Sequence, residues 1–228
     1  MHYAGWPVTI CAAYNDVRAK ETPSGPHPCS AAQHSQVLYS LFTHIPGLKT
    51  VIPSTPFDAK GLLISSIRDD DLVIFFEDIT LGAMKGPVPE EAYTIPLGKA
   101  DIKRPGTDLT IVAIGKMVHH ALKAAEDLQQ QGKSAEVIDP RTLSPFDEEA
   151  VLESVKKTGR LVVVDESHPR CSMASDIAAV VADKGFDYLN GPIKMVTSPH
   201  TPVPFSPPLE DHYLPNAQKI TAAAVSLF

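Results

Sequence analysis

His34 is a residue whose position could support acid–base chemistry. It stands just before a predicted helix, between Gln33 and Ser35. The first turn of a helix presents backbone amides that can hold an anion or a carboxylate. An imidazole there titrates near neutral pH and could donate a proton to a reacting oxo acid or acyl group. Alternatively, His34 caps the helix or is a satisfied structural histidine.

Two adjacent carboxylates form a second candidate. Asp165 and Glu166 follow the apolar run 161–164, which is typical of a strand buried on both faces of a parallel sheet. Ligands and partner chains approach an open α/β sheet at the carboxyl ends of such strands. The pair could do acid–base work, but we favour a role in holding a loop or an interface.

Other patterns predict no site. The spacing of His27, Cys29 and His34 matches no standard zinc pattern. His119 and His120 are predicted to be a surface pair. Neither the glycine spacing of a phosphate loop nor a G-x-S-x-G nucleophile turn is found.

The elements that must position these side chains follow from hydrophobic periodicity. In the first part of the chain the pattern predicts strands at 8–11, 50–52 and 72–76, and helices at 37–45 and from Ser54 or Thr55 to about Arg68. In the second part it predicts strands at 109–114, 135–138, 161–164 and 193–197, and helices at 118–128, 147–158, 173–182 and 217–227. This alternation indicates an α/β fold with a doubly wound, mostly parallel sheet.

Proline and glycine divide the chain. We predict a partial α/β domain over residues 1–84, a linker over 85–107 and a complete small α/β domain over 108–228. Seven prolines lie between Pro192 and Pro215, and we expect that tail to run extended over the surface.

Composition limits the class of protein. The net charge of −7 argues against nucleic acid or an anionic membrane as a partner. No apolar stretch approaches the roughly 18 residues that span a bilayer, and no secretory signal is recognised. Three cysteines without a framework spacing suit reduced thiols, so we expect a cytoplasmic protein.

Several runs agree in order and spacing with one family. They are Gln33-His34-Ser35-Gln36, His44-Ile45-Pro46-Gly47-Leu48, Ile52-Pro53-Ser54-Thr55-Pro56, and residues 139–147, 162–166 and 201–211. Together they resemble the β subunits of the thiamine-diphosphate-dependent 2-oxo acid dehydrogenases, of the pyruvate, branched-chain or acetoin type. The resemblance implies a partial pyrimidine-type thiamine-binding domain followed by a complete transketolase C-terminal-type domain.

The resemblance also implies site residues. It places His34 at the active-site funnel, near the thiazolium ring and the incoming lipoyl group. It places a structural potassium ion at the turn after the second helix, with Ser66, Ile67, Asp69 and Asp71 at the matching positions. Residue types alone predict only a solvated helix end there, and Leu72 stands where the family usually has proline.

Cofactors and partners follow from the same resemblance. Thiamine diphosphate and Mg²⁺ are expected only together with partner chains, because an α subunit brings their diphosphate-binding motif. The C-terminal domain is expected to form a homodimer and to dock a dihydrolipoyl acyltransferase core. Nucleic acid and membrane are not expected partners.

Two departures shape the functional expectation. About a third of the usual β subunit, including the cofactor-activating glutamate, has no counterpart at the N-terminal end, and residues 12–32 lack the family's glycine-rich loop. We therefore expect a truncated β subunit for oxidative decarboxylation of pyruvate or a related 2-oxo acid, inactive alone. The alternatives are a small-ester hydrolase using Ser30, His34 and Ser35, or a non-catalytic dimeric assembly module.

Overall fold

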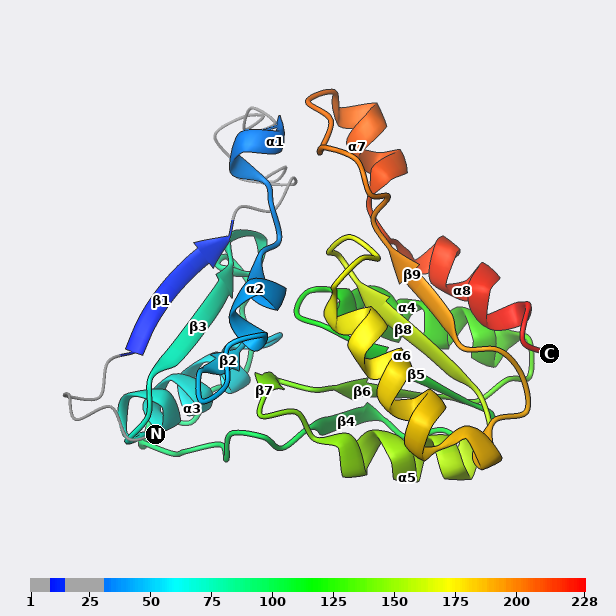
Figure 1. The fold of residues 1–228 in the computed structure, drawn as a ribbon, viewed down its shortest axis with the longest axis horizontal. Helices are drawn as coiled ribbons and strands as arrows, with labels where there is room; N and C mark the ends of the chain where they lie inside the picture. The colour runs from blue at the N-terminus through cyan, green and yellow to red at the C-terminus, as the bar shows by residue number, and fades with distance from the viewer. Residues whose placement is uncertain (1–8, 15–30) are drawn as a thin grey trace.

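Two β-sheets lie side by side in the chain (Figure 1). The computed structural model describes residues 9–14 and 31–228, with the side chains of 9–14, 33 and 34 left out of the description. The first sheet has the strand order β1-β3-β2-β7. Its strands are β1 (Thr9–Tyr14), β2 (Lys49–Val51), β3 (Val73–Asp78) and β7 (Thr142–Ser144). β1 and β2 run parallel to β3, whereas β7 is antiparallel to β2.

The second sheet has the strand order β4-β6-β5-β8-β9. Its strands are β4 (Asp101–Arg104), β5 (Leu109–Ala113), β6 (Ala135–Asp139), β8 (Leu161–Asp165) and β9 (Lys194–Thr197). All neighbours are parallel except β4, which is antiparallel to β6. The expected α/β fold with a mostly parallel second sheet is therefore confirmed.

Helices cover both faces of the second sheet. The helices are α1 (Ala31–His34), α2 (Tyr39–Thr43), α3 (Pro56–Ile67), α4 (Met117–Gln130), α5 (Glu148–Thr158), α6 (Met173–Lys184), α7 (Pro207–Tyr213) and α8 (Ala217–Val225), with short 3₁₀ turns at Ile79–Leu81 and Phe186–Tyr188. α4 and α8 pack together in one apolar cluster, while α5 and α6 belong to another. In the described part of the chain, no helix is both long and apolar enough to cross a lipid bilayer.

Local capping explains where two helices begin. The Thr55 hydroxyl accepts a hydrogen bond from the Asp58 amide at 3.1 Å, with Pro56 in the first turn of α3. The Asp147 carboxylate accepts from the Ala150 amide at 3.3 Å at the start of α5. Both starts agree with the sequence prediction.

The proline-rich tail is not extended throughout, contrary to expectation. Pro207 and Pro208 occupy the first turn of α7, where a helix needs no amide donor and the fixed φ of proline is already suitable. The segment expected as a linker also contains regular structure, because β4 joins the second sheet. Before β4 in the same segment, Ile95 is buried against the first sheet, in an apolar cluster with Phe75.

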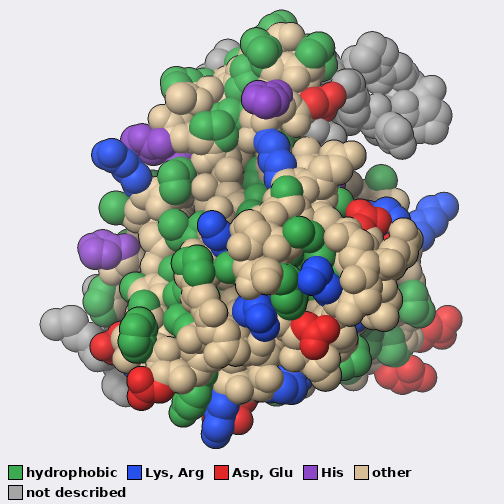
Figure 2. Space-filling model, turned by 90° about the vertical axis from the view of Figure 1, so that its right-hand side faces the viewer, with side chains coloured by type: hydrophobic (Ala, Val, Ile, Leu, Met, Phe, Trp, Pro, Cys, Tyr) green, Lys and Arg blue, Asp and Glu red, His purple; other side chains and the backbone are tan. Residues whose placement is uncertain are grey.

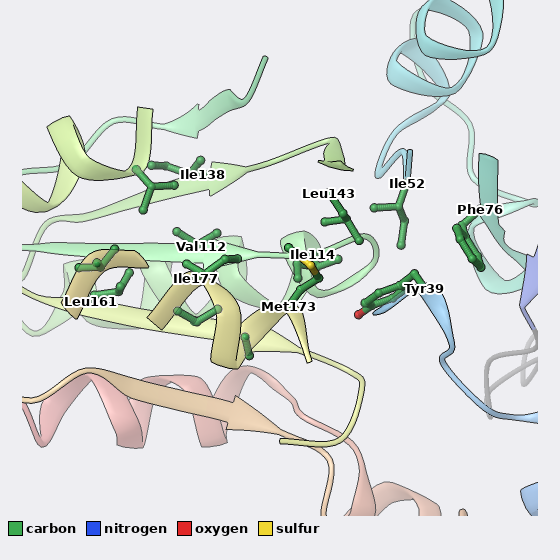
Figure 3. Packing of buried hydrophobic residues seen from close by; sticks show 14 of the residues in the cluster. Tyr39, Ile52, Phe76, Val112, Ile114, Ile138, Leu143, Leu161, Met173 and Ile177 are labelled. Carbon is green, nitrogen blue, oxygen red and sulfur yellow. The ribbon is translucent and has the colours of Figure 1, made fainter. Parts of the chain in front are cut away.

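A shared core joins the two sheets. One cluster of buried apolar side chains contains Tyr39, Ile52 and Phe76 from the first half, and Ile114 and Met173 from the second (Figure 3). Because close-packed side chains of both halves fill this cluster, it fixes the sheets relative to each other.

The surface built by the second half carries mixed charges. Figure 2, which shows the right-hand side of Figure 1, has basic, acidic and apolar side chains interspersed rather than gathered by type. Such a face generates no strong field of one sign that would attract a highly charged polymer.

Gly106 gives a direct test of the packing between the linker and β6. A Cβ atom there would lie 2.2 Å from the Ala135 carbonyl carbon and 2.2 Å from the Glu136 nitrogen. Since both are backbone atoms, we expect Gly106→Ala to lower the free energy of unfolding by about 1–3 kcal/mol or more in urea unfolding. The control Gly86→Ala meets only the Pro56 ring, at 3.5 Å, and should stay within about 0.5 kcal/mol. Equal stability of the two variants would contradict the packing described.

Candidate functional site

The carboxyl ends of the parallel strands β2 and β3 border a hollow of about 330 Å³. Its wall is largely apolar and includes Pro53, Leu81 and Met84, beside the first turn of α3. The carboxyl edge of an open parallel sheet is where α/β proteins bind their ligands. α1, which ends at His34, follows β1 of the same sheet, but the His34 side chain lies outside the described residues.

The hollow does not fit a diphosphate. Among the described residues that line it, the charged ones are Glu77 and Asp78, and both are acidic. Asp78 is buried, and its carboxylate accepts hydrogen bonds from the Thr80 amide at 2.8 Å and hydroxyl at 2.6 Å. Two carboxylates beside an apolar wall repel a phosphate rather than hold it. We therefore derive no reaction step through thiamine diphosphate from these residues.

A buried ion network ties the hollow's helix to the second half of the chain. The Asp58 carboxylate on α3 is fully buried; it accepts a hydrogen bond from Lys103 Nζ at 2.6 Å and forms an ion pair with Arg141 Nη2 at 2.8 Å. Asp101 bridges the same two cations, at 2.8 Å from each. Burial opposes the charge of Lys103, but Asp139 and the other carboxylates outweigh it and raise the pKa of Lys103. These cations are thus already committed to carboxylates.

Asp139, at the carboxyl end of β6, completes the network. It is fully buried and accepts hydrogen bonds from the Ser54 hydroxyl and, at 2.9 Å, from the Arg141 amide. Burial raises the pKa of Asp139 from 3.8 to about 6, and the nearby Asp58 adds to the rise while Lys103 opposes it. A carboxyl group that titrates near pH 6 therefore sits at the junction of the two sheets.

Asp165 and Glu166 hold the structure rather than face a ligand. The Asp165 carboxylate is fully buried and accepts from the Tyr39 hydroxyl, the Ser167 amide at 2.8 Å and the Ala174 amide at 3.3 Å. Burial raises the pKa of Asp165 despite these bonds. Glu166 accepts from Lys116 Nζ at 2.8 Å in a second buried pair. These bonds agree with the loop-holding role favoured from the sequence, and the interface role stays a prediction.

The prediction of a surface pair is wrong for His119. His119 is half-buried, and its Nε2 lies 2.8 Å from the carbonyl oxygen of Ser54, between the two halves of the chain. His120 is half-buried as well. No local pattern indicates this contact, because the partner of His119 lies 65 positions away in the chain.

The turn predicted to bind potassium has satisfied side chains. Lys49 Nζ lies 2.7 Å from an Asp69 oxygen and 3.1 Å from an Asp71 oxygen. The Ser66 hydroxyl donates to a carbonyl of its own helix, and the Ile67 side chain is exposed. One ammonium group thus pairs with both carboxylates and offsets part of their charge, and main-chain carbonyls are further oxygens for an ion. The site remains a prediction.

Ser35 does not suit the role of an exposed nucleophile. Its side chain is 2% exposed, and its hydroxyl has no hydrogen-bond partner among the described residues. A hydrolytic serine needs a base within hydrogen-bond reach and access for the ester. Ser30, the other serine of that hypothesis, lies outside the described residues. The structure gives the hydrolase alternative no support.

Two family descriptions match the chain. Residues 98–220 match "Transketolase, C-terminal domain", and residues 17–82 match "Transketolase, pyrimidine binding domain". A solved structure titled "Split gene transketolase, inactive beta4 tetramer" has a TM-score of 0.77 at 22% identity, covering 96% of this chain and 65% of that one. At this identity the likeness shows the fold alone.

Curated relatives are more similar in sequence. The "Acetoin:2,6-dichlorophenolindophenol oxidoreductase subunit beta" of Bacillus subtilis is 63% identical over 198 residues, which is 87% of this chain and 58% of the relative. The protein of the same description from Cupriavidus necator is 60% identical over 86% of this chain and 58% of the relative. "Pyruvate dehydrogenase E1 component subunit beta" of Bacillus subtilis is 48% identical over 84% and 59%. The chain thus spans somewhat more than half the length of these relatives.

The raised pKa of Asp139 predicts a specific pH dependence. Between about pH 4 and pH 6 the folded chain holds a proton on Asp139 that the unfolded chain has released, so this group makes the free energy of unfolding fall as pH rises. Asp139→Asn lacks that titration. We expect the stability of the wild type relative to the variant to fall by up to about 3 kcal/mol across this window, and to level off above about pH 7. Urea unfolding at several pH values measures it, and a constant difference would contradict the assignment.

Proposed function

Because the chain belongs to the transketolase C-terminal domain family, we propose that it is the β-type subunit of a thiamine-diphosphate-dependent enzyme acting on acetoin or a 2-oxo acid. The observation that carries the proposal is 63% identity over 198 residues to the β subunit of an acetoin oxidoreductase. Matches to β subunits of pyruvate and 2-oxoisovalerate dehydrogenases place the chain in the same group. The resemblance found in the sequence is confirmed at this level.

Acetoin is the substrate we propose. Two relatives described as acetoin oxidoreductase subunits are 63% and 60% identical, against 48% for the pyruvate dehydrogenase subunit. This choice departs from the sequence expectation of pyruvate or a related 2-oxo acid, because acetoin is a hydroxyketone and carries no carboxylate. Cleavage of acetoin and of a 2-oxo acid both require a nucleophile at a carbonyl carbon, which thiamine diphosphate supplies when bound.

A partner α subunit supplies the cofactor-binding groups in this proposal. The acidic, apolar hollow at β2 and β3 does not suit a diphosphate, and the buried cations Lys103, Arg141 and Lys116 are paired with carboxylates. We therefore assign diphosphate and Mg²⁺ binding to the partner. The further proposals are a potassium ion on the main-chain oxygens of 66–71, a homodimer through the second sheet's domain, and docking to an acyltransferase core.

His34 is the proposed proton donor. It follows β1 at the carboxyl end of the first sheet, where a substrate held between this chain and its partner would lie. A neutral-range imidazole can protonate an oxygen that gains charge as the acyl group forms or moves.

The test joins the chain to the part of the Bacillus subtilis acetoin β subunit that it does not cover, so that the cofactor-activating glutamate is present, and combines it with the companion subunit of that enzyme. We expect acetoin-dependent bleaching of 2,6-dichlorophenolindophenol that requires both subunits, thiamine diphosphate and Mg²⁺. His34→Ala should lower kcat by about a hundredfold or more, because general acid catalysis is lost. The control is His44→Ala, an exposed histidine at the end of α2, which should keep wild-type kcat.

Three results would contradict the proposal. Bleaching by the chain without the companion subunit would show that it needs no partner for cofactor binding. Full activity of His34→Ala would remove the histidine from the reaction. Turnover of pyruvate with none of acetoin would overturn the substrate.

A further inference from the structure

The segment between α1 and α2 lies against the second sheet's domain. Ser35 is buried, and Ser35–Val37 line a small hollow together with Glu166–His168, Val203, Tyr213 and Leu214. This wall is built by the loop after β8 and by the end of α7. A segment that carries a predicted reacting residue at one end is thus confined by the other half of the chain.

Tyr39 anchors the far end of this segment. Its side chain is 1% exposed, and its ring packs edge-on against Phe76 with centroids 6.0 Å apart. Its hydroxyl donates to an oxygen of Asp165, at the carboxyl end of β8. Ring packing fixes the tyrosine in the first half, and the hydrogen bond fixes it to the second.

The acceptor is rigid in turn. The Asp165 carboxylate is held by the Ser167 amide at 2.8 Å and by the Ala174 amide at 3.3 Å in the first turn of α6. A buried carboxylate that receives three donors has little freedom to follow a moving partner. If the Tyr39 side chain shifts, Asp165 therefore stays in place, and the segment between α1 and α2 must change its conformation.

The segment is also tied to α1 at its near end. The Gln36 side-chain amide donates to the Ala32 carbonyl at 3.1 Å. Four residues separate His34 from Tyr39, and the contacts of Ser35, Gln36 and Tyr39 lie along that stretch. The described segment 35–39 is thus tied to α1 at one end and to the second sheet's domain at the other.

We infer that Tyr39 and Asp165 are positioning residues for His34, so that a carboxylate of the C-terminal domain sets the place of the proposed proton donor. The expected effect on kcat rests on the proposed function. The expected effect on the NMR signal of His34 does not. In this view the domain after residue 108 is part of the active-site framework as well as an assembly unit.

The test removes one hydroxyl and leaves the ring. Tyr39→Phe keeps the contact with Phe76 and deletes the bond to Asp165. The control is Tyr93→Phe, which also removes one tyrosine hydroxyl but deletes an exposed bond, 2.7 Å to the Phe57 carbonyl on α3, away from the segment. Asp165→Asn is the second variant, because one of the two acceptor oxygens becomes an amide donor and the Tyr39, Ser167 and Ala174 donors can no longer all be accepted.

The first readout is NMR of the chain with isotope-labelled histidine. The His34 signal is identified by its loss in His34→Gln. We expect Tyr39→Phe and Asp165→Asn to shift the imidazole signal of His34 and the midpoint of its pH titration, while Tyr93→Phe leaves both unchanged. A His34 signal that is the same in all folded variants would overturn the inference, whatever the enzyme assay gives.

The second readout is kinetics with the companion subunit. Tyr39→Phe should lower kcat about ten- to hundredfold per folded enzyme, with KM for acetoin changed by less than about twofold. Tyr93→Phe should retain wild-type kcat. Unchanged kcat in Tyr39→Phe would overturn the positioning role. If His34→Gln keeps full activity, the proton-donor proposal fails, and the NMR shift alone then decides whether Tyr39 positions the segment.

Discussion

A buried carboxylate, Asp58, and the two cations that surround it join the halves of this chain. Taking such charges out of water is costly, and the cost is offset only when every group is paired with good geometry. Lys103 lies on β4 of the second sheet, and Arg141 follows β6 of the same sheet. Both meet Asp58 on α3, which belongs to the part of the chain that builds the first sheet. Loss of one partner would leave an uncompensated buried charge, at about 3–5 kcal/mol. The pairing therefore favours one relative placement of the two sheets.

Other features of the fold agree with that placement. β7 leaves the second half to pair with β2 of the first sheet, and the shared apolar cluster fills the space between the sheets (Figure 3). The Tyr39–Asp165 bond lies along the same junction. The hollow at β2 and β3 and the segment after α1 thus belong to one continuous framework. This is why a residue of the C-terminal domain can set geometry at the proposed active-site histidine.

Periodicity and capping predicted most helices and strands, because these signals are local. Thr55 and Asp147 cap their helices as expected. The junction could not be predicted in the same way. Tyr39 and Asp165 are 126 positions apart, and Ser54 and Asp139 are 85 apart. No local pattern links such residues, and the short strands β4 and β7 form only because a distant strand is present to pair with them. The family resemblance named His34 as a site residue, which stays a prediction, but it pointed to neither Tyr39 nor Asp165.

Native-state hydrogen exchange at increasing denaturant tests the joined framework most directly. If the junction makes the chain one cooperative unit, the most protected amides of β3 and of β8 should open with the same free energy, equal to that of global unfolding. This is the result we predict. Amides of β3 that open at a clearly lower free energy, while β8 stays protected, would show that the first sheet unfolds on its own and would contradict the account.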